Sequence, residues 1–174
     1  FAQSEFGLLC PISATDSTAM LIERYADEPI KQRLLPGMWS QDMTTILKGA
    51  QFMTEKTGGS DVGNIELAAR FEEGQWRLYG EKWFCSCADA DVALLLARPE
   101  GAVSGTAGLG LFALPRHLED GSRNSYRIVR LKSKLGSRSM ASGEITFDGA
   151  LVYPLGDVGP GRNPGLKQMM DQVN

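Results

Sequence analysis

The sequence predicts an α+β fold in which N-terminal helices pack beside a mainly antiparallel β-barrel or sandwich. Apolar residues recur at helical spacing over residues 14–50, and from Gly49 onward apolar and polar residues alternate instead. Turn-forming pairs such as Glu73-Gly74 and Asp120-Gly121 separate the alternating runs, as in antiparallel hairpins. With 174 residues, of which 43% are hydrophobic, the chain is long enough to bury a core of this kind.

Two helices are expected before the strands. The residues Ala14-Thr15-Asp16-Ser17 offer capping groups ahead of TAMLIERYA, whose apolar residues form one stripe. A second helix is expected from about Glu28 to Leu35, with its end at Pro36-Gly37. Because two short helices are not stable alone, their apolar faces need a partner in the barrel region or in sequence outside this chain.

Six runs then have the pattern of β-strands. The Gly-rich segment 101–110 between two of them is predicted to be a mobile loop at a hairpin tip. It is a poor match to a phosphate-binding loop, because it lacks the third glycine and the Lys-Ser/Thr ending. The runs are ELAARFEE, QWRLYGEKWFCS, DVALLLARP, GLGLFALPR, SYRIVRLK and GEITFDGALVYP.

Charge and cysteine content limit the classes of function. The formal net charge of −3 gives no electrostatic reason to expect nucleic acid or an anionic membrane, unless the charge is unevenly distributed. No apolar run approaches the ~20 residues that span a bilayer. Cys10, Cys85 and Cys87 are an odd number and too few for a disulfide scaffold, so a reducing, cytoplasmic setting is expected. Because His117 is the single histidine, buried thiols are a better interpretation of Cys85-x-Cys87 than a zinc site.

Both ends of the chain suggest a fragment. The chain begins at Phe1 rather than Met, and its last residues, GLKQMMDQVN, place Leu166, Met169, Met170 and Val173 at helical spacing. We therefore expect these residues to begin a helix of a longer protein.

Three stretches can carry chemistry. The first, QFMTEKTGGSDVG at 51–63, joins the hydroxyls of Thr54 and Ser60 to Gly58 and Gly59, which let a ligand approach the main chain closely. Freed backbone N–H groups there can form an anion-binding concavity, which suits a flat heteroaromatic ring with a phosphate tail. The alternative is a turn in which Asp61 caps the next segment.

The second stretch is KWFCSCA at 82–88. Trp83 and Phe84 are expected on opposite faces of a strand, so that one packs in the core and the other stacks on a ligand ring. Ser86 would share the face of Phe84, so the two would offer a ligand an aromatic ring and a hydroxyl side by side. The alternative is that the aromatic residues serve core packing alone.

The third stretch, KLGSRSMASGEITFDGALV at 134–152, begins with a turn or bulge at Gly136. Arg138 could pair with a phosphate or carboxylate, or it could be a solvated surface residue. The charged cluster from Arg116 to Arg123, which includes His117, is most simply an exposed hairpin turn. A single histidine without an ordered Ser and Asp gives no support for a hydrolytic triad.

Together the three stretches resemble the middle domain of the acyl-CoA dehydrogenase family. The family pattern T-E-x-x-x-G-S-D, which follows a hydrophobic residue, is matched by 53–61, and G-x-K-x-W-I-T is matched by 80–86. The closing pattern K-x-G-x-R … E-x-x-F-x-x-V/A is matched by 134–138 and 144–150. Three motifs in the right order and at the family's separations are far more specific than any one of them.

The resemblance also implies a domain organisation. Residues 1–48 resemble the last part of the family's N-terminal helical domain, in which E-x-x-K-Q-R-x-L-P stands here at 28–36. Residues 49–158 resemble the middle β-barrel domain, which binds flavin in the family. Residues 159–174 resemble the first turns of the C-terminal helical domain, so the resemblance places the rest of that domain outside these residues.

For the site, the resemblance implies an FAD-dependent oxidoreductase that dehydrogenates acyl-CoA thioesters in fatty acid metabolism. Phe84 and Ser86 stand where the family has Trp and Thr, and both replacements keep an aromatic face and a hydroxyl. The catalytic base of most members is a Glu of the C-terminal domain, so no residue here is assigned that role, Glu55 included. The cofactor-binding residues that the resemblance implies, with Ser60 also a candidate contact of the thioester, are Phe52, Met53, Thr54, Gly59, Ser60, Phe84, Cys85 and Ser86.

Departures from the family pattern point to one branch. Lys56 replaces the common Pro after T-E, and KWFxS, PRxLxDGxRN and RLKxKLGxRS resemble the AidB-like branch, which is linked to the adaptive response to DNA alkylation. The resemblance implies a homotetramer of the full-length protein, an acyl-CoA substrate and an electron-acceptor protein, with DNA contacted only through the C-terminal domain. A DNA-associated protective role with little dehydrogenase activity is the alternative function. For the isolated chain we expect little or no turnover.

Overall fold

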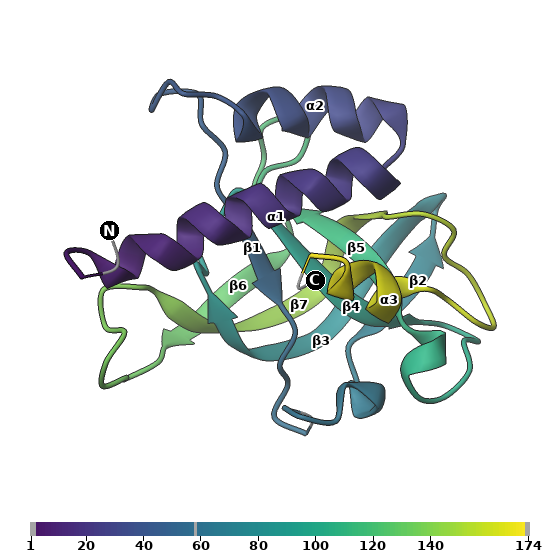
Figure 1. The fold of residues 1–174 in the computed structure, drawn as a ribbon. Coiled ribbons are helices and arrows are strands. Elements are labelled where there is room, and N and C mark those ends of the chain that lie inside the picture. Colours follow the sequence, from purple (N-terminus) through teal and green to yellow (C-terminus); the bar gives the residue numbers. More distant parts are fainter. Residues whose placement is uncertain (1–2, 58, 173–174) are drawn as a thin grey trace.

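Helices cover one side of a closed β-sheet in the computed structural model, which describes residues 3–57 and 59–172 (Figure 1). Gly58 and Val173, which the sequence singled out, lie outside the described residues. The helical elements are η1 (Phe6–Leu8), α1 (Leu9–Tyr25), α2 (Glu28–Met38), η2 (Val62–Asn64), η3 (Thr106–Gly108) and α3 (Gly165–Met170). The strands are β1 (Gly49–Phe52), β2 (Ala68–Glu72), β3 (Gln75–Ser86), β4 (Val92–Pro99), β5 (Gly110–Pro115), β6 (Tyr126–Leu131) and β7 (Ser142–Pro154).

The strands form one seven-stranded mixed sheet. Its order is β1-β4-β2-β3-β7-β5, β6 pairs with β7, and a further pairing of β5 with β4 closes the ring. Most pairs are antiparallel, as the sequence predicts, but β4 runs parallel to both β1 and β2. No hairpin joins β4 to either of these strands, so no turn residues mark the parallel pairs in the sequence.

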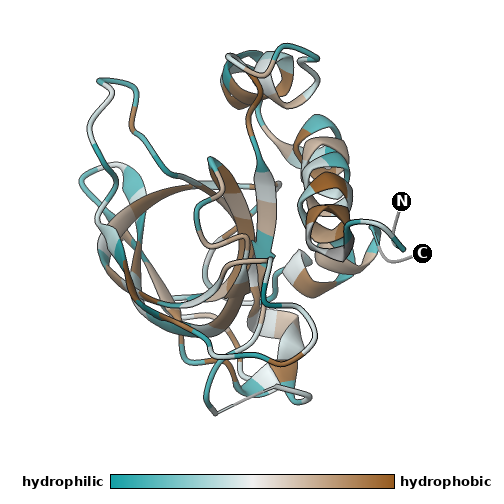
Figure 2. Cartoon of the chain, turned by 90° about the vertical axis from the view of Figure 1, so that its left-hand side faces the viewer, coloured by the Kyte–Doolittle hydropathy of each residue, from teal (hydrophilic) through white to brown (hydrophobic). Residues whose placement is uncertain are grey.

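β4 separates two hydrophobic cores. Ala93, Leu95 and Ala97 face the inside of the barrel, whereas Val92, Leu94 and Leu96 face the helices. Both faces of this strand are therefore covered, which explains why its sequence is a continuous apolar run without alternation. Figure 2 shows the helices as a layer beside the barrel, so that the second core lies between them.

α1 packs on this outer face of the sheet, so the barrel supplies the partner that the predicted helices need. The buried residues of α1 are Thr18, Ala19, Leu21 and Ile22. The predicted start of the helix at residues 14–17 is wrong, because α1 begins at Leu9. The hydroxyls expected to cap the helix instead bond back to carbonyls one turn earlier, as Thr15 does to Pro11 O at 2.7 Å.

α2 begins at Glu28 as predicted but does not end at Pro36-Gly37. The helix continues to Met38, whose side chain is buried beside Leu34 and Leu35. Trp39 N donates to Leu35 O at 2.9 Å and closes the last turn beyond Pro36. Burial of the apolar face thus outweighs the missing N–H of Pro36, which is itself exposed to solvent.

Other sequence predictions agree with the structure. Glu73 and Gly74 have φ angles of 52° and 79°, and they join β2 to β3 as a two-residue hairpin turn. The helical spacing near the C-terminus corresponds to α3, in which Met169 is fully buried.

Candidate functional site

The first stretch continues from the end of β1. The Phe52 side chain is 2% exposed within the barrel core, so a ligand could reach only its main chain. Met53 packs against the helix-side core and Thr54 is half-buried, whereas Gly59 and Ser60 are exposed. A Cβ placed on Gly59 would lie 4.0 Å from Thr54 Cγ2, so the loop folds back over Thr54. The side chains that could face a ligand are therefore those of Met53, Thr54 and Ser60.

A buried ion pair ties this loop to β3. Lys82 Nζ lies 2.7 Å from Glu55 Oε1, and the two side chains are 0% and 4% exposed. Lys82 Nζ also donates to Met53 O at 3.2 Å. The Glu55 carboxylate accepts hydrogen bonds from the backbone N–H groups of Glu66 and Leu67. Burial lowers the pKa of Lys82, and the neighbouring Glu55 carboxylate opposes that shift.

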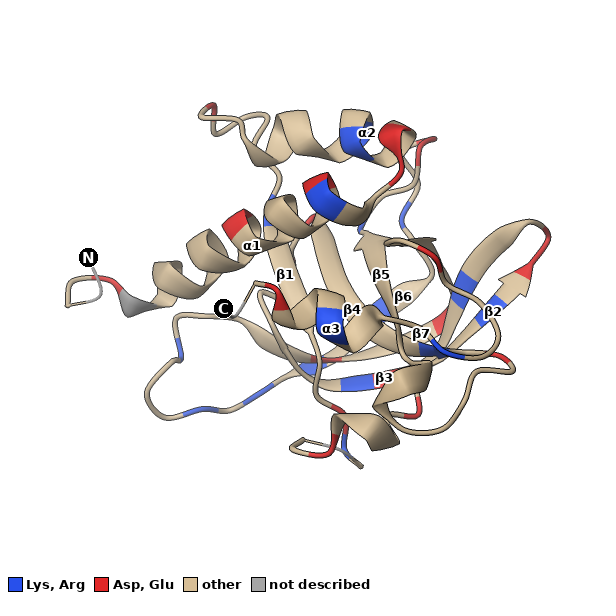
Figure 3. Cartoon of the chain, turned by 45° about the vertical axis from the view of Figure 1, so that its right-hand side comes forward, with Lys and Arg blue, Asp and Glu red and all other residues tan. Residues whose placement is uncertain are grey.

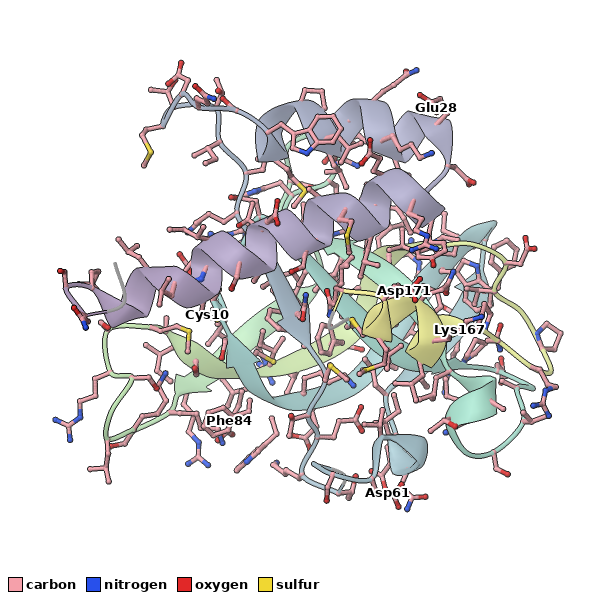
Figure 4. The ribbon with its side chains drawn as sticks, in the orientation of Figure 1. Cys10, Glu28, Asp61, Phe84, Lys167 and Asp171 are labelled. Atoms are coloured by element: carbon pink, nitrogen blue, oxygen red, sulfur yellow. The ribbon has the colours of Figure 1, made fainter. Side chains whose placement is uncertain are left out.

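The main chain joins the same two stretches, since Trp83 N donates to Thr54 O at 2.8 Å. The β3–β7 pairing shifts register between Lys82 and Cys85, and this irregularity changes which side chains point inward. The core positions are Lys82 and Cys85, so the prediction that one of the two aromatic residues packs in the core is wrong. Phe84 is 44% exposed, and it lies on the lower side of the barrel in Figure 4, as does Asp61 at the end of the first stretch.

Trp83 is instead half-buried under cations on the outside of the sheet. Lys132 Nζ lies 2.9 Å and Lys56 Nζ lies 4.8 Å from the centre of its ring. Lys56 also pairs with Glu81 at 2.8 Å. Lys56, which departs from the family pattern, thus contacts Trp83 and Glu81 of β3.

A row of hydrogen bonds joins the second stretch to the third. Lys134 Nζ donates to Ser142 Oγ at 2.8 Å, and Ser142 Oγ lies 3.3 Å from Ser86 Oγ. Because an ammonium group only donates, Ser142 Oγ accepts from Lys134 and can point its own proton at Ser86. The proton of the Ser86 hydroxyl is then free to be donated to a ligand. Sequence reasoning missed Lys134 and Ser142 as site residues, although both lie in the third stretch.

Arg138 does not join this row. Its side chain is exposed, and its Nε donates to Lys134 O at 2.6 Å, so it closes the loop before β7. His117 is likewise exposed and forms an isolated bridge with Arg123, which confirms the hairpin interpretation of that charged cluster. Asp61 makes no side-chain bond to a backbone N–H of η2 and bonds the Asn64 side chain instead.

The cysteines are free thiols in buried or half-buried positions. Burial is the main cause that raises the pKa of Cys85 to about 12 and that of Cys87 to about 12. Cys85 is fully buried, so a ligand could reach its main chain but not its sulfur. Across residues 3–57 and 59–172, no three His, Cys, Asp or Glu side chains are grouped closely enough to hold a metal ion. Nor does any helix in that part of the chain have the length and apolar character needed to cross a bilayer.

The three stretches are thus joined to one another at β3, which carries the exposed ring of Phe84. The Glu55–Lys82 pair fixes the first to the second, and the Lys134–Ser142–Ser86 row fixes the second to the third. The result is a preorganised wall that offers a ring face at Phe84, a hydroxyl donor at Ser86, and a polar loop at Thr54 and Ser60. Such a wall can hold a flat ring and donate a hydrogen bond to it.

Comparison with known proteins gives a consistent result. Residues 50–150 match the family model described as acyl-CoA dehydrogenase, middle domain. AidB of Escherichia coli strain K12 is 41% identical over 169 residues, which are 92% of this chain and 30% of that protein. Acyl-CoA dehydrogenase family member 11 of Caenorhabditis elegans is 37% identical over 180 residues, which are 98% of this chain and 29% of that protein. The chain thus spans about three tenths of the length of these relatives.

Solved structures show the same fold. The Caenorhabditis elegans protein ACDH-11, solved in complex with C11-CoA, superimposes with a TM-score of 0.84 at 34% identity. That superposition covers 94% of this chain and 28% of the other. The apo form of Bd2924 superimposes with a TM-score of 0.85 at 38% identity, over 94% of this chain and 33% of the other.

Proposed function

This chain belongs to the acyl-CoA dehydrogenase family, and on that premise we propose that it supplies one wall of the FAD and thioester pocket of an acyl-CoA dehydrogenase. The reaction would be α,β-dehydrogenation of an acyl-CoA, in which bound FAD supplies the acceptor for the hydride that leaves Cβ. The observation behind the proposal is that the first and third stretches are both bonded to the end of β3 that carries Phe84 and Ser86. The complex of ACDH-11 with C11-CoA supports the choice of a thioester substrate, because that protein is similar over nearly the whole chain.

The residues of the wall fit FAD chemically. Phe84 offers an exposed ring face for stacking against a flat heteroaromatic system. Ser86 donates a hydrogen bond whose direction is set by Lys134 through Ser142, and Thr54 adds a second hydroxyl. Phe52, Met53 and Cys85 would contribute backbone groups along the ring edge, and Met53 would add apolar contact.

The polar loop would hold the anionic part of the ligands. Gly59 and Ser60 are exposed, so their N–H groups and the Ser60 hydroxyl can approach cofactor phosphates or the thioester. Glu55 is unsuited to proton abstraction, because its carboxylate is buried, paired with Lys82 and bonded to two backbone N–H groups. We therefore assign the base to a part of the protein outside these 174 residues and predict little or no turnover by the chain itself.

The domain organisation follows from the same premise. We propose that residues 1–48 complete an N-terminal helical domain, that residues 49–158 form the flavin-binding barrel, and that residues 159–174 begin a C-terminal helical domain. The full-length protein would be a homotetramer that passes electrons to an acceptor protein. The free cysteines support a cytoplasmic location.

A second candidate function rests on the 41% identity to AidB. In this alternative the protein is an AidB-like flavoprotein with a DNA-associated protective role and little dehydrogenase activity, and DNA is contacted outside this chain. Both candidates require FAD, so the flavin tests the proposal common to them, and acyl-CoA turnover by the full-length protein separates them.

The test is FAD binding by the 174-residue chain and by the full-length protein, followed by the flavin absorption bands and by thermal shift. We expect both to respond, and we expect Phe84→Ala to weaken binding about tenfold through lost stacking. The matched control is Phe71→Ala, which removes another exposed ring, at 61% exposure, far from the wall. A colourless full-length protein whose melting temperature FAD does not change would overturn the proposal.

A further inference from the structure

A third of the basic residues of this acidic protein lie in one short segment at the edge of the sheet. We call residues 123–138, which run from just before β6 into the loop after it, the basic edge. From Gly121 to Gly143 the sequence contains no Asp or Glu. Figure 3 shows the blue segments following one another along the loop beyond β6. The basic residues of the basic edge are Arg123, Arg127, Arg130, Lys132, Lys134 and Arg138.

Most of this charge is not neutralised. Glu144 pairs with Arg130 and Lys132, both at 2.6 Å. Arg127 Nε donates to the neutral Thr146 Oγ1, and Arg138 and Lys134 bond neutral backbone oxygens of their own loop. Within the described residues, Arg123, Arg127, Lys134 and Arg138 have no carboxylate partner at salt-bridge distance. The basic edge therefore retains a surplus of exposed positive charge.

The same segment has unpaired backbone groups. β6 pairs with β7 on one side and with no other strand among the described residues. Asp148 N donates to Ser125 O and Lys132 N donates to Ser142 O, so these positions face β7. In an antiparallel ladder the alternate residues turn their N–H and C=O groups the other way, which leaves Ile128 facing the open edge. An exposed edge of this kind is a template for a further strand.

Apolar side chains lie among the cations. Val129 is 53%, Leu131 61% and Leu135 90% exposed. Cations, free backbone groups and apolar side chains together match the requirements of β-strand addition, in which the main chain supplies affinity and the side chains supply specificity. We propose that the basic edge is a docking site for an acidic, extended segment of a partner protein, which adds to β6 as a further strand.

Charge outside the basic edge favours a short acidic peptide over a nucleic acid. The rest of the chain has 12 of the 18 basic residues to oppose all 21 acidic ones. A long polyanion would therefore be repelled wherever it extended beyond the basic edge, whereas a segment with bounded negative charge would be steered to it. The backbone groups of β6 also pair with a peptide, and a nucleic acid has no matching ladder.

The experiment measures fluorescence anisotropy of a labelled ten-residue peptide of alternating Glu and Val with the 174-residue chain at low salt. We expect saturable binding that weakens at least tenfold in the triple variant Arg123→Glu/Arg127→Glu/Arg138→Glu. The matched control, Arg70→Glu/Arg162→Glu/Lys167→Glu, makes the same change in net charge at exposed positions elsewhere and should bind like the wild type. A peptide N-methylated at alternate residues, which keeps its charge but cannot form the ladder, should bind at least tenfold more weakly.

Four outcomes would overturn the proposal. They are absence of binding, equal weakening in both triple variants, equal binding of the N-methylated peptide, and tighter binding of a twenty-nucleotide oligothymidine than of the acidic peptide. Absence of peptide binding together with aggregation of the charge-reversed variant would show instead that the cations protect an open edge from self-association. Circular dichroism of both triple variants checks that each is folded.

Discussion

Lys82→Met removes one half of the buried ion pair that joins the first two stretches. Lys82 and Glu55 are 0% and 4% exposed and 2.7 Å apart, so the substitution leaves a buried carboxylate without its countercharge. Loss of one partner of such a pair costs about 3–5 kcal/mol. The hydrogen bonds from Glu66 N and Leu67 N remain, which favours the lower part of that range.

The measurement is urea unfolding followed by circular dichroism, with thermal unfolding as a second readout. At roughly 2–4 °C per kcal/mol for a chain of this size, we expect the melting temperature to fall by about 6–20 °C. The double variant Lys82→Met/Glu55→Gln should recover part of the loss, because it removes the unpaired buried charge and its single amide oxygen can still accept one of the two backbone hydrogen bonds. A single variant that loses less than about 1 kcal/mol, or a double variant less stable than the single one, would show that the buried pair does not hold the two stretches together.

Three further predictions concern the hydroxyl row, the thiols and acid stability. Ser86→Ala should weaken FAD binding about fivefold in a flavin titration, and it should change the melting temperature of the free protein by no more than about 2 °C. The control Ser122→Ala, at an exposed turn, should change neither FAD binding nor the melting temperature. Burial raises the pKa of Cys85 and of Cys87 to about 12, so iodoacetamide at pH 7.5 should label the half-buried Cys10 first in the folded protein. Equal labelling of all three cysteines, measured by mass spectrometry, would contradict the burial of Cys85 and Cys87. Burial alone would raise the pKa of Glu144, but hydrogen bonds from Lys132 and Arg130 outweigh that effect, so the pKa of Glu144 is lowered. A hydrogen bond from Lys48 likewise lowers the pKa of Asp89. Carboxylates with lowered pKa values stabilise the fold above about pH 4 and lose that contribution as the pH falls further. The melting temperature should therefore decrease when the pH is lowered below about 4, and it should decrease less in the Glu144→Gln variant.

Much of the fold could be predicted because its strands have local signals. The Glu73-Gly74 turn and the alternation in QWRLYGEKWFCS predicted the β2–β3 hairpin. The position of Pro29 likewise predicted the start of α2 at Glu28. The parallel pairing of β4 could not be predicted, since it depends on strands that meet through space without a shared turn. The predicted end of α2 was wrong because burial of Met38 extends the helix past Pro36, whereas α1 begins at Leu9, well before the first residue that this helix buries, Thr18.

The candidate site was predicted in its parts but not in its connections. The polar loop and the exposed ring of Phe84 were visible as residue types, whereas the irregular pairing that turns Trp83 outward and Cys85 inward is a property of β7 as much as of β3. The pairing of Lys82 with Glu55, 27 residues apart, required the backbone to bring two charges into the core. Ser142 had no signal of its own, because a serine at the start of a strand is common, and its role depends on the neighbours that the fold gives it.

We propose above that FAD contacts the wall formed by the three stretches. Backbone amide chemical shifts of the isotopically labelled 174-residue chain, recorded during titration with FAD, test this claim directly and remain informative if binding is weak. We expect shifts concentrated at residues 53–60, 84–86 and 134–142. Shifts confined to other surfaces, such as the recess lined by Phe71, Trp76 and Pro160, would contradict it.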